Sequence, residues 1–358
     1  MAIFSRAAQA AGFARALAAV DPTAIVLQSM RDVAIALAGS SSSAYREVRD
    51  TLLGASPSAR PAGVYVDLVD INGRSSPPPT DLHIVVVDPD RVRDEAIRDY
   101  LATIHARKGR VIAVLARDPG HPRLEGSIAS GERAAAEAAL GLPSDTIAVF
   151  QASDSARSTR HLAAAITSGL PDRQLTLARG LPGLREAIAH RMILDAAIAN
   201  GQFALVASLP ALIPLVGGLV AIGADTIILT RNQATLVFQL AAIHGRRLDR
   251  RAQLVAEIAP VIGGAFVWRT VARALAGFLP GAVGALPRGA IAFAGTYVVG
   301  QIANEYYRSG RRPDPDTIER FGREAAQLAI RRASAMTGGL SGWRRVLARV
   351  PGRRRPSG

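Results

Sequence analysis

The chain of 358 residues contains no cysteine. This absence excludes disulfide bonds, thiol catalysis and metal sites built on cysteine ligands. Aromatic residues are also scarce, at 5%, although 49% of the residues are hydrophobic. Lys108 is the only lysine, so arginine supplies almost all of the 43 basic residues. This arginine bias, together with abundant alanine and glycine, is typical of a GC-rich bacterial genome and does not by itself indicate nucleic-acid binding.

Positive charge is concentrated at the end of the chain. The net charge is +14, and residues 308–358 contain 13 arginines against four acidic residues. A basic segment of this kind attracts anionic lipid, an acidic protein partner or nucleic acid. Trp343 is the only aromatic residue among the last arginines, so the interleaving expected of a nucleic-acid binder is missing and nucleic acid is the least favoured partner.

The first half of the chain has the pattern of an α/β domain. Apolar runs rich in β-branched residues alternate with helical patterns such as 91–107 and 130–140. The runs are Val33–Ala38, Val64–Val69, Leu82–Val87, Val111–Leu115 and Thr146–Phe150. Strands that are apolar throughout and separated by helices predict a parallel sheet covered on both faces. The turn at Gly180–Gly183 breaks the chain, and we place the end of this domain at residue 182.

The loop after the first strand has the position and length of a phosphate-binding loop but lacks its chemistry. Gly39–Arg46 lies between a strand and a helix, where G-x-x-x-x-G-K-[ST] would bind phosphate. Ala44 stands in place of the second glycine, Tyr45 in place of the lysine and Arg46 in place of the magnesium-binding hydroxyl. Without that lysine and hydroxyl, the charge stabilisation on which phosphoryl transfer depends is missing.

Two later loops extend the comparison. Asp70–Gly73 matches D-x-x-G directly after the second strand, and Asp118 is the one residue that survives where N-K-x-D would bind guanine. Because these loops follow their strands in the same order, the first half resembles a degenerate Ras-like GTP-binding domain. The resemblance implies vestigial phosphate and magnesium positions at Gly39, Ser43, Asp70, Gly73 and Asp118. The short spacing between the first loop and Asp70 implies that a switch strand is reduced or absent.

Three interpretations of this half stay open at this point. They are an α/β domain without a nucleotide, a GTPase-like domain that cannot hydrolyse GTP, and an active, atypical GTPase. The six histidines show no metal-ligand spacing. The sequence predicts no catalytic residue and no metal site, and it assigns no cofactor; if GTP binds, it is not expected to be hydrolysed.

Residues 183–310 are hydrophobic and rich in glycine and proline, which predicts an all-α domain. Phe203–Leu229 and Ala276–Ala303 each hold a single charge, and either is long enough to cross a bilayer as a helix. Internal prolines argue against straight helices. Arginines lie on both flanks and in the connecting segment, and two crossings would place some of them on the far side of the membrane. A shallow re-entrant hairpin or a helical bundle is therefore favoured over two-pass insertion.

Several stretches of this half are similar to the hydrophobic domain of unknown function found in YcjF-like bacterial inner-membrane proteins and after GTPase domains. The similarity covers about residues 209–307. It is carried by ALIPLVGGLVAIGAD (211–225), LAAIHGRRL (240–248), EIAPVIGGAFVWRTVAR (257–273), FLPG (278–281) and AIAFAGTYVVG (290–300). The similarity implies association with the cytoplasmic face of a bacterial inner membrane and a role linked to a GTPase-like domain, with no known chemistry.

In the hydrophobic half, the candidate residues are those expected to serve in helix packing or in lipid contact. Glycines allow helices to approach closely in a membrane or in a bundle. The candidate glycines are Gly217, Gly218, Gly263, Gly264, Gly277 and Gly281. Asp225 would be a functional residue inside a bilayer, and its alternative is an ion pair with Arg231 at a helix end.

Residues 311–358 predict a basic amphipathic helix followed by a flexible arginine-rich tail. The helix cap is predicted at Asp314 with Pro315, or at Asp316 with Glu319. One helix face carries Ile318, Phe321, Ala325 and Leu328. That face would lie on a membrane or pack on its own domain.

These features together predict a non-catalytic, membrane-associated interaction or regulatory protein. The expected partner is a membrane or anionic lipid surface, with a protein partner or self-association as a further expectation. The alternatives are an atypical active GTPase and a soluble helical scaffold without lipid contact.

Overall fold

The computed structural model describes residues 16–40, 42–54, 63–73, 76–117, 130–207, 221–262 and 285–347. The chain divides into two compact units. We call residues 21–192 with 238–249 the α/β unit, and residues 1–20, 193–237 and 250–358 the helical unit. The division falls inside helix α8 (Arg185–Ala207), between Met192 and Ile193, a little after the Gly180–Gly183 turn at which the sequence places the domain end.

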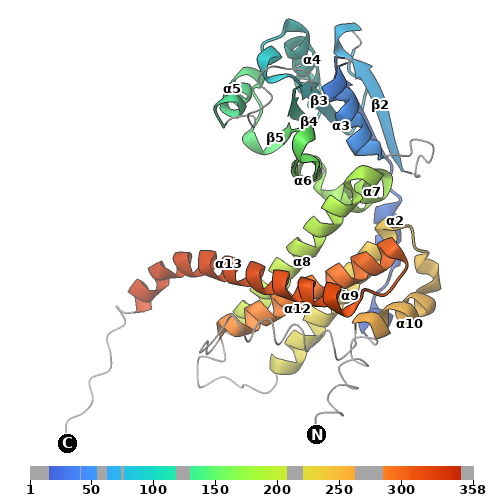
Figure 1. The fold of residues 1–358 in the computed structure, drawn as a ribbon, viewed down its shortest axis with the longest axis vertical. Coiled ribbons are helices and arrows are strands. Elements are labelled where there is room, and N and C mark those ends of the chain that lie inside the picture. The colour runs from blue at the N-terminus through green and yellow to red at the C-terminus, as the bar shows by residue number, and fades with distance from the viewer. Residues whose placement is uncertain are drawn as a thin grey trace, which may run out of the picture. The chain divides into compact units, whose positions relative to one another are not determined.

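The α/β unit is built on one five-stranded sheet in which every strand pairing is parallel (Figure 1). The strands are β1 (Val33–Gly39), β2 (Val64–Asp70), β3 (Leu82–Val87), β4 (Val111–Ala116) and β5 (Ile147–Phe150). Their order across the sheet is β2-β1-β3-β4-β5. The predicted α/β fold class with a parallel sheet is confirmed, and each strand lies within one residue of the apolar run that predicts it.

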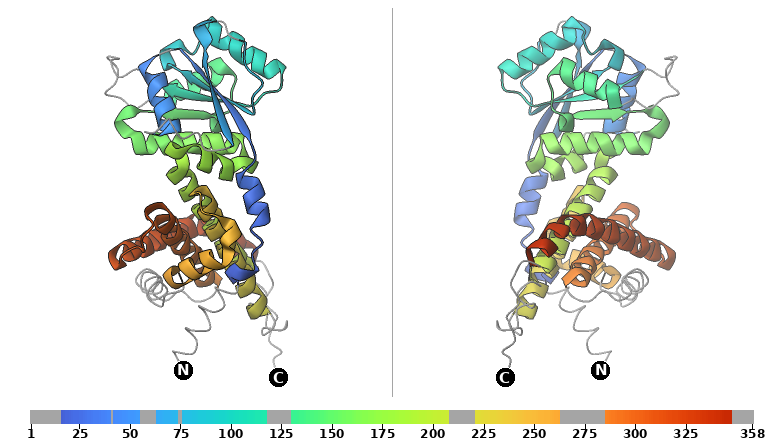
Figure 2. Two further views of the ribbon diagram at one scale, coloured as in Figure 1. Left: turned by 90° about the vertical axis from the view of Figure 1, so that its right-hand side faces the viewer. Right: turned by 90° about the vertical axis from the view of Figure 1, so that its left-hand side faces the viewer.

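Helices cover both faces of this sheet (Figure 2). On one face, α4 (Glu95–Ala106) and α5 (Ser130–Leu140) share a core with alternate residues of β3 and β4, such as Val85 and Ala113. On the other face lie α3 (Ser43–Leu53) and α6 (Ser155–Gly169), and a Cβ added at Gly169 would meet the side chains of Leu82 and Ile112. Burial on both faces explains why these strands are apolar throughout.

Strand β2 is an edge of the sheet and pairs with β1 alone among the described residues. Tyr65 is 56% exposed and Leu68 is 54% exposed, so β2 differs from the other strands in showing large apolar side chains to solvent. Asp67, at the middle of the strand, is exposed as well. No further strand is described between α3 and β2, where the resemblance to GTP-binding domains implies a reduced or absent switch strand.

Further helical segments of the α/β unit include α2 (Thr23–Ser29), α7 (Gln174–Gly180) and the first turns of α8. The turn between α7 and α8 packs tightly, because a Cβ added at Gly183 would lie 1.7 Å from the backbone oxygen of Thr51 in α3. Only glycine fits such a contact between two backbones.

The helical unit contains the rest of α8, most of α9 (Ala221–Ile243), α10 (Arg251–Ile262), α12 (Ala285–Ser309) and α13 (Pro315–Leu347). Asp314 caps α13, since its Oδ1 accepts a hydrogen bond of 2.7 Å from the backbone N–H of Thr317, and Pro315 is the first helical residue as predicted. Ile318, Phe321 and Ala325 are buried where α13 packs against α12. The apolar face of α13 is therefore used within its own domain over these residues.

None of the helices in the described part of the chain is both long and apolar enough to cross a bilayer. The glycines singled out for helix packing, Gly217, Gly218, Gly263, Gly264, Gly277 and Gly281, lie outside the described residues. Asp225 belongs to α9, but its side chain is not described. The end of the chain from residue 348, which the sequence predicts as a flexible tail, is also outside the described residues.

A buried polar cluster ties three helices of the helical unit together. The side-chain amide of Asn200 in α8 donates a hydrogen bond of 2.9 Å to Oγ1 of Thr296 in α12. Gln233 in α9 donates to the same oxygen over 3.1 Å, and Asn232 donates to Oδ1 of Asn200 over 2.8 Å. Asn200 and Thr296 are almost completely buried, so these bonds satisfy groups that water cannot reach.

Candidate functional site

The carboxyl ends of β1 and β3 mark the place where a ligand is expected in this sheet. In open parallel sheets, ligands bind outside the carboxyl ends of the strands, at the point where the strand order reverses, which here lies between β1 and β3. Gly39 and Asp70 end two neighbouring strands and are paired in register. The structure thus brings together the two positions that the sequence singled out in separate loops.

The side chain of Tyr45 occupies the position next to Gly39. A Cβ atom added at Gly39 would lie 2.7 Å from Cδ2 of Tyr45 and 3.3 Å from Cβ of Val86. The tyrosine hydroxyl donates a hydrogen bond of 3.0 Å to the backbone oxygen of Leu37 in β1. Tyr45 is only 8% exposed, and burial raises the pKa of its phenol, with Arg49 acting in the opposite direction. Tyr45, which stands where the resemblance would place a phosphate-binding lysine, is therefore folded back onto the sheet as part of the core.

The first turn of α3 is capped by the chain itself. Oγ of Ser42 accepts a hydrogen bond of 3.2 Å from the backbone N–H of Tyr45. Phosphate bound at a helix N-terminus would need such N–H groups for itself. Ser43, the predicted vestigial position, is the first residue of the helix and is half-buried.

Asp70 and Gly73 come together in the short turn after β2. The Asp70 carboxylate accepts a hydrogen bond of 3.0 Å from the backbone N–H of Asn72, and it lies about 4 Å from the place of a Cβ on Gly73. Asp70 and Gly73 are both exposed. In this structure the carboxylate of Asp70 stabilises its own turn.

Arg117, directly after β4, makes a charged cluster that sequence analysis did not identify. Its side chain is 6% exposed and forms ion pairs with Glu132 in α5 and, over 3.7 Å, with Asp90 after β3. Burial disfavours the guanidinium charge, but the hydrogen bond and charge of Glu132, with Asp90 and Asp88, outweigh it and raise the Arg117 pKa. Asp118, the predicted vestigial guanine position, lies outside the described residues.

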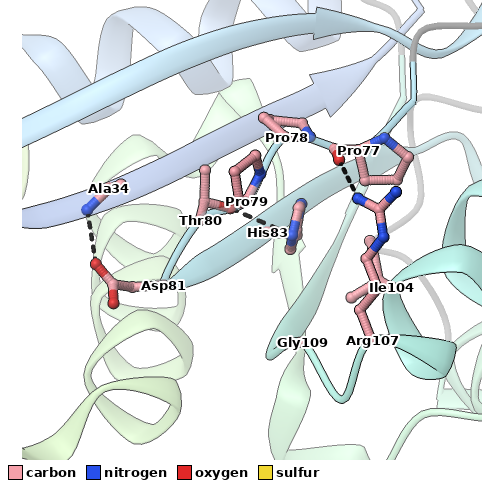
Figure 3. Close-up of a pocket in the computed structure, with 10 residues that line it drawn as sticks. All are labelled: Ala34, Pro77, Pro78, Pro79, Thr80, Asp81, His83, Ile104, Arg107 and Gly109. Atoms are coloured by element: carbon pink, nitrogen blue, oxygen red, sulfur yellow. Dashed lines mark hydrogen bonds between the residues drawn. The ribbon is translucent and has the colours of Figure 1, made fainter.

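A second candidate site lies at the opposite, amino edge of the sheet. It is a pocket of about 400 Å³ (Figure 3). The pocket is lined by Ala34, Pro77, Pro78, Pro79, Thr80, Asp81, His83, Ile104, Arg107 and Gly109. We call it the amino-edge pocket. The sequence indicated no site here, because the lining comes from separate segments of the chain, among them the start of β3 and the turn after α4.

The centre of the amino-edge pocket is a hydrogen-bonded chain of neutral groups. Nε2 of His83 lies 3.2 Å from Oγ1 of Thr80, and its Nδ1 lies 3.3 Å from the hydroxyl of Tyr100. Burial lowers the pKa of His83, and the charge of Arg107 lowers it further. Burial raises the pKa of Tyr100 to about 12. The imidazole is therefore neutral at pH 7, donating through one nitrogen and accepting through the other.

Charged groups flank this neutral centre. Arg107 donates hydrogen bonds to the backbone oxygen of Pro77 over 2.6 Å and to Oγ of Ser76 over 3.2 Å. Oδ2 of Asp81 accepts a hydrogen bond of 2.9 Å from the backbone N–H of Ala34. Both charged side chains are thus held in place from one side by the backbone.

Comparisons with known proteins supply no family for this chain. No protein-family model, no curated protein and no solved structure matches it significantly. Within the described residues, no group of three or more histidine, aspartate and glutamate side chains is placed to hold a metal ion.

Proposed function

We propose that this chain is a non-catalytic interaction or regulatory protein that works at a membrane surface and carries a degenerate GTPase-like domain. The observation that carries the proposal is the position of Tyr45. Its ring packs beside Gly39 and its hydroxyl is bonded to β1, so the side chain is buried in the core and does not extend toward a nucleotide. In the phosphate-binding motif a lysine at this position contacts the phosphates, whereas a buried tyrosine supplies no positive charge to them.

The nucleotide part of the proposal is tested by calorimetry. Titration of the intact chain with GTP and Mg²⁺ should give no saturable heat up to about 1 mM, which corresponds to a binding free energy weaker than about −4 kcal/mol. Tyr45→Phe keeps the ring and serves as the control. Tyr45→Ala removes the ring, so any gain in affinity for GTP is expected in this variant and not in Tyr45→Phe. Micromolar affinity of the wild-type chain together with GTP turnover would establish the rival, an active GTPase.

The membrane part of the proposal rests on the solvent face of α13. Arg320, Arg323 and Arg331 are all exposed. Their spacing places them on one side of the helix, opposite the buried residues Ile318 and Ala325. Since the apolar face is already packed on α12, contact with a lipid surface would be electrostatic. Arginines near an anionic surface contribute about 1 kcal/mol each.

Sedimentation with lipid vesicles tests whether Arg320, Arg323 and Arg331 bind a lipid surface. The chain should pellet with vesicles containing phosphatidylglycerol and stay in the supernatant with phosphatidylcholine. Replacing Arg320, Arg323 and Arg331 by glutamine should weaken binding about a hundredfold, given about 1 kcal/mol for each arginine. The matched control replaces Arg93, Arg98 and Arg110, three exposed arginines of the α/β unit, by glutamine.

The outcomes of the vesicle experiment separate the remaining alternatives. A chain that stays in the supernatant with both lipids is a soluble scaffold, and the membrane proposal is then wrong. Equal loss of binding in both triple variants would mean that total charge, not the face of α13, is responsible. High salt should release the chain from vesicles, because exposed charges are screened within about 10 Å at 0.1 M.

A further inference from the structure

The amino-edge pocket is a preformed cavity that the proposed function does not use. Its wall is stiff, because Pro77, Pro78 and Pro79 fix the backbone before β3. A Cβ added at Gly109 would lie 2.7 Å from Cγ2 of Ile104, so the turn after α4 is also closely packed. About 400 Å³ is within the range of small-molecule sites.

The two charged groups of the pocket lie at opposite ends of it. Figure 3 shows Asp81 at one end and Arg107 at the other, with Thr80 and His83 between them. Among the described residues, Arg107 donates only to Pro77 and Ser76, which leaves other N–H groups of the guanidinium available. Asp81 is exposed, and its Oδ2 is bonded to Ala34, while its Oδ1 has no hydrogen bond to any residue that the structure describes.

The centre between these ends carries no charge. His83 is neutral, and its two nitrogens are occupied by Thr80 and Tyr100. The rest of the wall is apolar, from the proline rings and Ile104. A ligand that crosses the pocket therefore meets a cation, a neutral apolar stretch and a carboxylate in turn.

We propose that the amino-edge pocket binds a small zwitterion with separated charges, its carboxylate on Arg107 and its ammonium group on Asp81. A short peptide with free termini and an ω-amino acid both belong to this class. A simple anion is disfavoured, because the carboxylate of Asp81 repels it and its binding leaves that carboxylate without a cation. A simple cation is disfavoured by Arg107. Only a ligand with both charges, held apart, satisfies both ends.

The proposal is tested with 6-aminohexanoate and triglycine as probes and hexanoate and hexylamine as one-charge controls. NMR chemical shifts or calorimetry on the intact chain should show saturable binding of the zwitterions. Hexanoate and hexylamine should bind at least tenfold more weakly. Asp81→Asn keeps an oxygen to accept from Ala34, and Arg107→Gln keeps a polar side chain. Each should weaken zwitterion binding at least tenfold.

Asp99→Asn and Arg110→Gln provide matched controls, because both residues are exposed and neither lines the pocket. They should bind the probes like the wild-type chain. Circular dichroism of each variant verifies that it is folded. The proposal is overturned by any of three results. These are no saturable binding of either zwitterion up to about 10 mM, equal binding of a one-charge probe, or unchanged binding in the Asp81 and Arg107 variants. None of these results depends on whether the chain binds GTP or lipid.

Discussion

Gly183→Ala should destabilise the α/β unit by about 3 kcal/mol or more, at the upper end of what overpacking costs. The new Cβ would lie 1.7 Å from the backbone oxygen of Thr51 and 3.2 Å from the backbone nitrogen of Gly54. Side chains can move away from a clash, but these atoms belong to the backbone at the end of α3. Relief would require separating the turn before α8 from that helix.

Thermal or urea unfolding measures the loss of stability, and the control is an alanine substitution at a glycine with space around it. Gly131 lies in α5 and has no atom within 4 Å of an added Cβ, so Gly131→Ala should leave the free energy of unfolding unchanged or raise it by up to about 1 kcal/mol. A Gly183→Ala variant as stable as wild type would show that the turn between α7 and α8 can shift without loss.

Thr296→Val should cost the helical unit about 2–5 kcal/mol, because it leaves two buried amide donors without an acceptor. Oγ1 of Thr296 accepts from both Asn200 and Gln233, which are 0% and 8% exposed. Valine keeps the shape of threonine, so the loss reports the hydrogen bonds and not a cavity. Unfolding should be followed by a probe of the helical unit, such as hydrogen exchange in α12.

Thr235→Val is the matched control for this substitution. Thr235 in α9 also donates to the backbone oxygen four residues earlier, as Thr296 does, and no side chain in the described part of the chain is bonded to it. Its replacement should change stability by about 1 kcal/mol at most. If Thr296→Val has as small an effect as Thr235→Val, the amides of Asn200 and Gln233 have other acceptors or access to water. Adding Gln233→Leu should recover part of the loss, since it removes one of the unsatisfied donors.

The strands were predictable because each one is a continuous apolar run with β-branched residues. The run Leu82–Val87 coincides with β3, and the helical pattern 130–140 coincides with α5. Burial of the sheet on both faces produces this signal directly. The cap of α13 was also predictable, since Asp314 before Pro315 satisfies local backbone groups that do not depend on the rest of the fold.

The side chains at the two edges of the sheet were harder to predict. The sequence predicts that Tyr45 stands where a GTP-binding domain has a lysine. It does not predict that the ring lies on β1, which depends on the space that Gly39 leaves. The partners of Arg117 come from two separate loops, and no local pattern connects them. The same holds for the amino-edge pocket, where His83 and Arg107 meet only because β3 and α4 pack together.

For α13, the sequence left two roles open for the apolar face. A periodic apolar face predicts burial but does not say what covers it. In the structure α12 covers Ile318, Phe321 and Ala325, while Leu328 is half-buried. The arginines of the opposite face then become the part of the helix available to partners.

The exposed edge of β2 bears on how the chain behaves when it is concentrated. An open strand edge with tyrosine and leucine in solvent is a template for sheet-to-sheet aggregation. If two molecules joined their β2 edges antiparallel about a two-fold axis through the strand centre, the two copies of Asp67 would stand directly opposite each other. Like charges in that position repel, and a charged residue in mid-strand also interrupts fibril-forming segments. Asp67 thus protects the exposed edge of β2 against pairing with a second copy of itself.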